Sequence, residues 1–383
     1  MNSAFFLVLR RMRAPIIVLI VIYAIAVIGL TLVPGVDAEG KVAAPLSFFH
    51  AFYFVSYTAT TIGFGEIPNA FSDAQRLWVT ICIYLTVVGW SYSVVTLIAL
   101  LQDKGFQNTL TTNRFVRRIH HLKEPFYLVC GCGETGNLIC RTFDRTNQAF
   151  VVIEKDELRV QELDLQDFKT DTPALAADAR QPDNLLLGGL KHAKCRGVLA
   201  ATNDEESNLA IAIAVRLLNP NIPVIARVRS APLAANMASF GTNHIINPYE
   251  RFAEHLAMAV AAPERFRLTE LLTSLPETPM PAPHRPPKGH WILCGYGRFG
   301  HAIASRLAAT GIRLTIIDPK AADADHRIPG DGTEAHTLLQ AGISNAAGII
   351  AGTDNDVNNL SIAVTAHQLN PALFVVARQN HSA

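Results

Sequence analysis

The hydrophobic pattern of the chain begins with two long uncharged runs, residues 15–33 and 77–101. Each run meets the roughly 20 apolar residues that a helix needs to cross about 30 Å of hydrocarbon. We therefore predict two membrane-spanning helices. Residues 45–60 form an aromatic-rich helical piece between the two runs. This piece is too short to span, so we expect a re-entrant helix.

The later part of the chain alternates short apolar runs with helical stretches. Segments 126–136 and 291–300 each start as an apolar run, break into Gly-x-Gly-x-x-Gly and continue as a helix. In each copy an acid, Glu154 or Asp318, ends the next strand 18 residues after the third glycine. Further downstream the copies match again, at 198–209 and 349–360. The soluble part is therefore an internal duplication.

Each repeat places its glycines in the context of a dinucleotide-binding fingerprint. The first glycine permits a tight turn, the second lets phosphate approach the backbone, and the third lets helix meet sheet. Free amides at the helix start face the phosphates. Glu154 and Asp318 are placed to accept hydrogen bonds from ribose hydroxyls, which favours NAD(H) or an adenine nucleotide without a 2′-phosphate. The alternative is a Rossmann scaffold whose pockets stay empty.

These patterns predict a membrane α-helical module, with two spans and a re-entrant helix, followed by two α/β Rossmann-like domains. The expected domains are a transmembrane domain at 1–101, a linker at 102–124, a first Rossmann domain with a crossover segment at 125–275, a Pro-rich linker at 276–289, and a second Rossmann domain at 290–383. The second copy lacks the segment that follows the first, so the chain is either natively short or a fragment.

Charge is distributed unevenly around the apolar runs, although the net charge of +1 gives no argument for a nucleic-acid partner. Basic residues precede the first span and follow the second, whereas Lys41 and Arg76 are the only Lys or Arg residues in the loop between the spans. By the positive-inside rule, we predict a multi-pass protein of the cell inner (plasma) membrane with cytoplasmic N- and C-termini. The flanking basic residues are Arg10, Arg11, Arg13, Lys104, Arg114, Arg117, Arg118 and Lys123.

The six cysteines suit a reducing compartment and lack a C-x-x-C spacing. Cys130 and Cys294 occupy the same place in the two repeats, at the end of a strand. We expect both to be small buried thiols.

Residues 58–66, T-A-T-T-I-G-F-G-E, lie between the re-entrant piece and the second span. Gly63 and Gly65 alternate with larger residues, and glycine accepts backbone angles that other residues avoid. Such an alternation lets consecutive carbonyls point the same way, so copies that meet on an axis form a column of oxygens. Stacked carbonyl rings replace the water shell of a monovalent cation; the potassium-channel filter is the known example.

The nonapeptide resembles the signature sequence of potassium channels, with Phe64 for the usual Tyr and Glu66 for the usual Asp. In those channels two pore-helix aromatics brace the filter, and Tyr53 and Phe54 match them. Tyr57 stands where many relatives have a Glu. The resemblance implies that residues 1–101 are a membrane α-helical pore module, with residues 45–60 as the re-entrant pore helix and the nonapeptide as the filter. It also implies K⁺ bound by backbone carbonyls of Thr61, Ile62, Gly63, Phe64 and Gly65.

The soluble half resembles tandem RCK (regulator of K⁺ conductance, TrkA-N-like) domains, and the chain as a whole looks like a two-transmembrane prokaryotic potassium channel. The resemblance implies a homotetramer in the bilayer whose eight domains form a cytoplasmic gating ring. NAD(H) or an adenine nucleotide is the expected gating ligand. The resemblance leaves Ca²⁺ open as a second ligand; nearby carboxylates are Asp156, Glu157, Asp164, Asp167, Glu205 and Glu206.

The resemblance also implies the nucleotide-binding residues of each repeat. The first pocket would use Gly131, Cys132, Gly133, Glu134, Thr135, Glu154, Lys155, Asp178, Thr202 and Asn203. The second would use Gly295, Tyr296, Gly297, Arg298, Phe299, Asp318, Asp331 and Thr353. Arg298 would add a cation beside phosphate, whereas Glu134 holds the matching place in the first copy, so we expect the copies to differ in ligand or affinity.

Three further segments have two interpretations each. Residues 244–260 predict a strand and an amphipathic helix with Phe252, Leu256 and Val260 on one face; it either crosses to a partner domain or packs locally. Gly89 in the second span is either a gating hinge or a close-packing site. Basic side chains at 114–118 contact lipid headgroups or form a solvated helix face.

No residue needs to perform covalent chemistry in this scheme, so we expect a channel and not an enzyme. Three alternatives remain. A membrane-anchored oxidoreductase needs a substrate domain and an acid or base beside the nicotinamide, and neither is visible. A nucleotide-binding regulatory subunit of a cation transporter leaves residues 58–66 unexplained. A non-selective cation channel is distinguished by reversal potentials.

Overall fold

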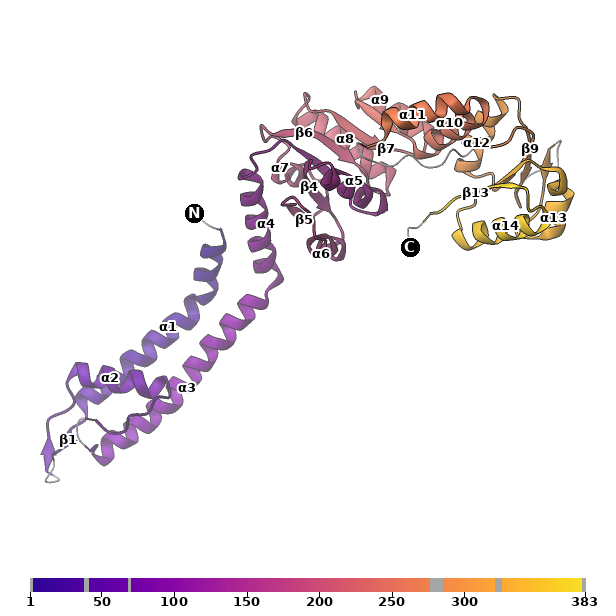
Figure 1. Cartoon of the computed structure of the whole chain (residues 1–383). Coiled ribbons are helices and arrows are strands. Elements are labelled where there is room, and N and C mark those ends of the chain that lie inside the picture. Colours follow the sequence, from indigo (N-terminus) through magenta and orange to yellow (C-terminus); the bar gives the residue numbers. More distant parts are fainter. Residues whose placement is uncertain (1–2, 38–40, 68–69, 276–284, 321–325, 381–383) are drawn as a thin grey trace. The chain divides into compact units, whose positions relative to one another are not determined.

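The computed structural model describes residues 3–37, 41–67, 70–275, 285–320 and 326–380. The chain divides into two compact units, Met1–Arg114 and Phe115–Ala383, and each is described by itself (Figure 1). Most of the predicted Pro-rich linker, at 276–284, lies outside the described residues.

The first unit is built from two long helices and a short one. Two of its segments, Val8–Leu32 and Asp73–Gln102, are long and apolar enough to cross a membrane. The short helix spans 12 residues, as the re-entrant prediction requires. The unit therefore has the predicted pore-module elements. They are α1 (Ser3–Leu32), β1 (Gly35–Val36), β2 (Val42–Ala43), α2 (Phe48–Ala59), α3 (Asp73–Gln102) and the start of α4 (Lys104–His120).

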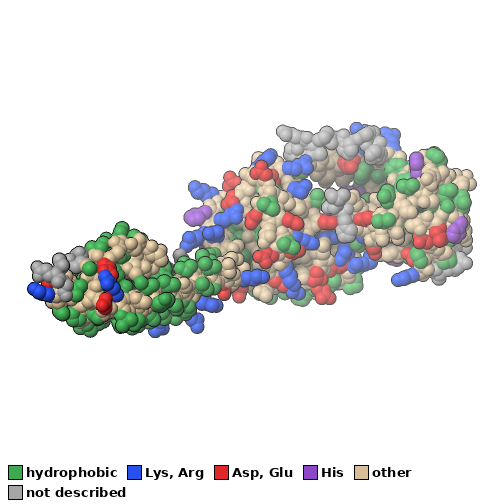
Figure 2. Space-filling view, turned by 90° about the horizontal axis from the view of Figure 1, so that it is seen from below, with side chains coloured by type: hydrophobic (Ala, Val, Ile, Leu, Met, Phe, Trp, Pro, Cys, Tyr) green, Lys and Arg blue, Asp and Glu red, His purple; other side chains and the backbone are tan. Residues whose placement is uncertain are grey.

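Small residues let α1 and α3 approach closely. A Cβ added at Gly89 would lie 2.7 Å from Cδ1 of Ile22, and one added at Gly29 would lie 2.0 Å from the ring of Trp78. Because α3 continues unbroken through Gly89, this glycine acts as a packing site in the structure. Apolar side chains cover much of this unit's surface, whereas charged side chains of both signs cover the second unit (Figure 2).

The second unit contains two parallel sheets. The first has the strand order β5-β4-β3-β6-β7-β8, which is the order of a Rossmann fold. Its strands are β3 (Phe126–Cys130), β4 (Ala149–Glu154), β5 (Ala174–Ala176), β6 (Cys195–Ala200), β7 (Val224–Arg227) and β8 (His244–Ile246). Its helices are α5 (Glu134–Arg145), α6 (Glu157–Leu165), α7 (Pro182–Leu187), α8 (Glu205–Leu218) and α9 (Ala231–Ser239).

The second sheet repeats this order for five strands, β11-β10-β9-β12-β13. Its strands are β9 (His290–Cys294), β10 (Arg313–Ile317), β11 (Arg327–Ile328), β12 (Gly348–Ala351) and β13 (Phe374–Ala377). Its helices are α12 (Arg298–Ala308), α13 (Ala335–Gln340), a 3-10 turn (Ile343–Asn345) and α14 (Asp356–Leu369). In each sheet the glycine-rich loop follows the first strand, β3 or β9. The strand order reverses beside this strand, and ligands usually bind at such a switch point.

The buried thiols follow the prediction. All six cysteines are free and buried. Burial raises the pKa of Cys195 to about 11 and that of Cys294 to about 12, so these thiols stay protonated and unreactive at neutral pH.

The end of α4 packs on the first sheet. Phe115 and Ile119 are buried in the core of that sheet. Arg118 forms an ion pair with Asp171. The predicted choice for Arg118 was between lipid headgroups and solvent, but in the structure its guanidinium contacts a carboxylate of the first Rossmann domain.

Helix α10 (Pro248–Ala261) follows the first sheet in sequence but packs against the second. Leu256 and Val260 share a buried cluster with Ile303 and Leu307 of α12. Phe252 packs on Phe299, with ring centroids 5.4 Å apart. The predicted apolar face is thus used to join the two Rossmann domains of one chain, and α11 (Pro263–Thr273) follows it.

We expect Leu256→Ala to destabilise this joint by about 2–5 kcal/mol, because the change leaves a cavity in a buried cluster. Thermal unfolding of the purified chain measures the effect. Leu271→Ala on exposed α11 is the matched control and should shift the midpoint little. Equal shifts for both variants would contradict the packing role of α10.

The contact at Gly89 makes a second prediction. Gly89→Ala should lower thermal stability by about 1–3 kcal/mol, because its methyl group would overlap Ile22. Shortening that neighbour in the double variant Gly89→Ala, Ile22→Ala should restore part of the loss. A hinge role without packing predicts no such rescue.

Candidate functional sites

The filter segment has the alternating backbone that its glycines predict. Thr61, Gly63 and Gly65 have positive φ values of 64°, 67° and 86°. Among the described residues, no hydrogen bond reaches the carbonyl oxygens of residues 61–64. Because residues 61–64 are exposed, these four oxygens are available to water or to a cation.

Tyr57 holds this segment against the pore helix. The amides of Ile62 and Gly63 donate to the Tyr57 carbonyl at 2.9 and 3.4 Å, and the Tyr57 hydroxyl donates to the Gly65 carbonyl at 2.5 Å. The Phe64 ring packs on Tyr57, with centroids 5.3 Å apart. The predicted ion ligand Gly65 therefore already has one hydrogen-bond donor, unlike the four preceding carbonyls.

Of the two aromatics expected to brace the filter segment, Tyr53 contacts it directly in the described chain. Tyr53 stacks on Phe64, whereas Phe54 packs against Tyr57 and Phe71. At the position where many relatives have a Glu, the Tyr57 hydroxyl instead donates a hydrogen bond to the Gly65 carbonyl. The sequence does not reveal this bond, because the Tyr57 hydroxyl meets the Gly65 carbonyl only when the filter segment folds back along α2.

Glu66 fastens the end of the filter to the start of α3. Its carboxylate accepts from Nε and Nη2 of Arg76 at 2.9 and 3.1 Å and from the Phe71 amide at 2.9 Å. A bidentate pair of this kind fixes geometry as well as charge.

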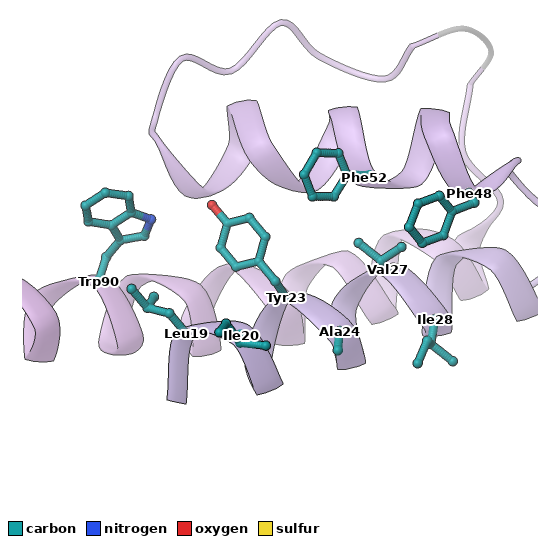
Figure 3. A pocket seen from close by; sticks show the side chains of 9 residues that line it. All are labelled: Leu19, Ile20, Tyr23, Ala24, Val27, Ile28, Phe48, Phe52 and Trp90. Carbon is teal, nitrogen blue, oxygen red and sulfur yellow. The ribbon is translucent and has the colours of Figure 1, made fainter. Parts of the chain in front are cut away.

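An apolar groove of about 540 Å³ lies beside the pore helix (Figure 3). Phe48 and Phe52 of α2 face side chains of α1, and Trp90 of α3 closes one end. Such a lining suits hydrocarbon and not water. The groove is lined by Leu19, Ile20, Tyr23, Ala24, Val27, Ile28, Phe48, Phe52 and Trp90.

The first nucleotide pocket forms at the carboxyl ends of the strands. Gly131 has φ +92°, and a Cβ there would lie 2.8 Å from the Thr202 backbone. A Cβ on Gly136 would lie 2.1 Å from the Gly131 carbonyl. These two glycines therefore serve the tight turn and the helix–sheet contact, as the fingerprint requires.

Glu154 supports the loop from below. It is 7% exposed, and its carboxylate accepts from the amides of Cys132 and Asp156. A carboxylate has about four acceptor positions, so capacity remains for a ribose hydroxyl. Asp318 repeats the arrangement, accepting from Tyr296 and Lys320 amides at 2.7 and 2.8 Å.

Seven of the ten residues predicted for the first pocket line one cavity of about 260 Å³. They are Gly131, Gly133, Glu154, Lys155, Asp178, Thr202 and Asn203. Cys132 and Glu134 line an adjoining cavity of about 290 Å³, which shares Gly133 and Arg159 with the first. Thr135 is in neither lining.

Two arginines of this pocket were missed. Arg159 Nη1 lies 3.2 Å from the Cβ position of Gly133, where a phosphate would approach. Arg180 binds Asp178 and holds the pKa of that carboxyl below its ordinary value. Arg159 is five residues after the acid that ends β4, so its spacing was visible, but only the fold shows that it reaches Gly133.

The residues predicted for the second pocket make contacts of different kinds with the rest of the protein. The Phe299 side chain is buried against Tyr249 and Phe252 of α10, and its ring lies 3.0 Å from the Cβ position of Gly352, so it packs beneath the loop that carries Thr353. The Tyr296 ring lies under Arg327, at 4.9 Å, and Arg298 is paired with Glu205. Asp331 caps its own turn through Thr333, and Thr353 is held by Asn359.

A matching asparagine in each copy positions the loop after the fourth strand, and this feature was also missed. Asn208 accepts from the Thr202 amide at 3.0 Å and donates to the Arg227 carbonyl at 2.9 Å. Asn359 makes the same two contacts, at 2.8 and 2.9 Å, in the second copy. Both asparagines are buried.

The described part of the chain gives no support to Ca²⁺, which the resemblance left open as a second ligand. Within the described ranges, no three His, Cys, Asp or Glu side chains group closely enough to hold a metal ion. Glu205 is instead engaged by two arginines.

Comparison with known families divides the chain as the fold does. The TrkA-N domain model matches residues 127–248 and 291–383, and the ion channel model matches residues 16–103. An uncharacterized protein of Methanothermus fervidus is 28% identical over 65% of this chain and 38% of its own length. Potassium channel protein 1 of Methanocaldococcus jannaschii is 26% identical over 63% of this chain and 67% of its own length.

Solved structures share the fold of the whole chain. The GsuK channel superposes with a TM-score of 0.55 at 24% identity, covering 99% of this chain and 91% of that one. Structures of GsuK with ADP and with NAD give TM-scores of 0.53 and 0.52, at 24% and 20% identity. The chain thus belongs to the TrkA-N domain family, as a two-span ion-channel protein with two such domains in tandem.

Proposed function

We propose that the protein is a potassium-selective channel gated by nucleotide binding to its TrkA-N domains. The observation that carries the proposal is the run of four carbonyl oxygens at residues 61–64 that accept no hydrogen bond from the described chain. Carbonyl oxygens in stacked rings replace the hydration shell of K⁺.

One such strand forms only one wall of a pathway, so the proposal requires a homotetramer. Four copies around an axis turn the exposed strand into carbonyl rings. The apolar surfaces of α1 and α3, and the groove beside α2, are then covered by lipid and neighbouring subunits. We place the protein in the cell inner (plasma) membrane with both termini cytoplasmic, because basic residues precede the first span and follow the second.

The proposed gating ligand is NAD(H) or an adenine nucleotide in the first pocket. Glu154 is placed for a ribose without a 2′-phosphate, and Arg159 supplies a cation beside Gly133. GsuK, which shares this fold, is named as bound to ADP in one structure and to NAD in another. Eight domains from four chains would form the gating ring.

The energetics of gating are modest. Shifting a gate from 1:99 to 99:1 takes roughly 5.5 kcal/mol of differential affinity. Shared among four equivalent sites, this is ~1.4 kcal/mol per site, within ordinary coupling energies. Transport of K⁺, and not catalysis, is the proposed output. A regulatory subunit of a transporter would leave the unpaired carbonyls without a role.

We expect Gly63→Ala to abolish K⁺ flux in reconstituted vesicles. The φ of +67° is strained for alanine by about 1–2 kcal/mol per chain, so the carbonyl orientation changes. Ile62→Val leaves the backbone unaltered and should retain flux. Full flux through Gly63→Ala would contradict the filter assignment, and an unshifted reversal potential in a K⁺/Na⁺ gradient would indicate a non-selective pore.

Gly131→Asp should remove the nucleotide response. The backbone of an aspartate is strained at φ +92°, and its carboxylate repels phosphate. Glu154→Ala should weaken it by removing the ribose acceptor. Flux is measured from vesicles against NAD⁺, NADH, ADP and ATP. Gly311→Asp, at a positive-φ turn with open space around it, is the matched control. An unaltered response in Gly131→Asp and Glu154→Ala would exclude control through the first pocket.

A further inference from the structure

The cation of the second glycine-rich loop is bound by the first domain. Arg298 directly follows Gly297 at the start of α12, where a phosphate would approach the loop. Nothing lies within 4 Å of a Cβ built on Gly297, so that approach is open. Arg298 nevertheless donates from Nη1 to Oε1 of Glu205, 2.8 Å away and 93 residues earlier in the chain.

Glu205 is a shielded carboxylate with partners in both domains. Its side chain is 11% exposed. Besides Arg298, it accepts from the Arg229 amide at 3.1 Å and from Arg229 Nε at 3.2 Å. Burial raises the pKa of Glu205, but Arg229 and Arg298 together outweigh that effect and hold the pKa below its ordinary value. The carboxylate is therefore charged when it meets Arg298.

The first loop is arranged differently. Its Gly133 already faces Arg159 and Asn203 from its own domain, at 3.2 and 3.4 Å from the Cβ position. The place of Arg298 is taken there by Glu134. The first loop thus has its donors ready within one domain, whereas the side-chain cation of the second is shared with an acid from the other domain.

We propose that Glu205 and Arg298 form an interdomain latch, which a nucleotide phosphate at the second glycine-rich loop must open. This inference rests on the proposed function, since it assumes that the second loop takes a phosphate-bearing ligand. A phosphate and the Glu205 carboxylate compete for the same guanidinium. The latch consequently lowers the affinity of the second site, and occupancy of that site loosens the contact between the two domains.

The latch also lies beside the first pocket. Asp204, the residue before Glu205, caps α8 and lines the first cavity. The start of α8 therefore carries two adjacent acids: Asp204 lines the first pocket, and Glu205 binds Arg298 of the second glycine-rich loop. If a ligand at one site moves the first turn of α8, it changes the ligand affinity of the other site, and linkage makes this effect reciprocal.

The test measures ADP binding to the purified full chain by titration calorimetry. Gly131→Asp serves as the background, so that the binding observed is that of the second site. Adding Glu205→Gln should tighten ADP binding about three- to tenfold, because the competing charge is removed. Adding Glu205→Asp, which keeps a charge for Arg229 but shortens the side chain, should give a smaller gain and covers the case in which Glu205→Gln does not fold.

Glu254→Gln is the matched control. Glu254 pairs with Arg306 of the same helix α12, at 2.9 Å, and so also joins α12 to the preceding domain segment. It should leave ADP affinity unchanged. Arg298→Gln should weaken ADP binding whether or not Glu205 is present.

Three outcomes would overturn the latch. ADP affinity that is unchanged or lower in both Glu205 variants would show that the acid does not compete. An equal gain with Glu254→Gln would indicate general loosening of the domains. No ADP binding to the Gly131→Asp background, with or without Glu205, would show that the second loop takes no such phosphate. Failure of the proposed function is separate, because it appears as flux through the unaltered chain that none of NAD⁺, NADH, ADP and ATP changes.

Discussion

The free carbonyl oxygens of residues 61–64 are the constraint around which the first unit is built. These residues are exposed, and their oxygens accept no hydrogen bond from the described chain, so they are open to water or to a cation. Everything around the segment holds it in that state. Tyr57 clamps it to the pore helix, and Glu66 ties its far end to Arg76. Relative to a simple loop, the aromatic packing and these bonds keep the oxygens oriented before any ion arrives.

The two Rossmann domains show how one scaffold serves two different loops. The asparagine contacts of Asn208 and Asn359 are nearly identical, so the backbone around each pocket is held in the same way. The side chains above the loops differ. Arg159 faces the first loop from its own domain, whereas Arg298 reaches away from the second loop to Glu205. Duplication preserved the support and changed the charged groups.

Helix α10 makes the two domains into one unit. It follows the first sheet in sequence, and its apolar face is buried on α12 of the second. Tyr249 at its start receives a hydrogen bond from Arg378 at 3.2 Å. The second glycine-rich loop therefore opens a helix that is packed on α10 and paired with Glu205 of the first domain. In the proposed scheme, a nucleotide at this loop would act directly beside the contact between the domains.

The spans, the pore helix, the glycine alternation and both fingerprints could be predicted from sequence, because each depends on residues close together in the chain. Hydrophobic run length and the permitted φ of glycine are local properties. The partners of Tyr57, Arg159 and Arg298, and the surface on which α10 packs, could not be predicted in this way. Arg298 and Glu205 are 93 residues apart and meet only in the folded chain, in which α10 follows the first sheet and packs against α12 of the second domain. A side chain's partner depends on how whole elements pack, and no short stretch of sequence contains that information.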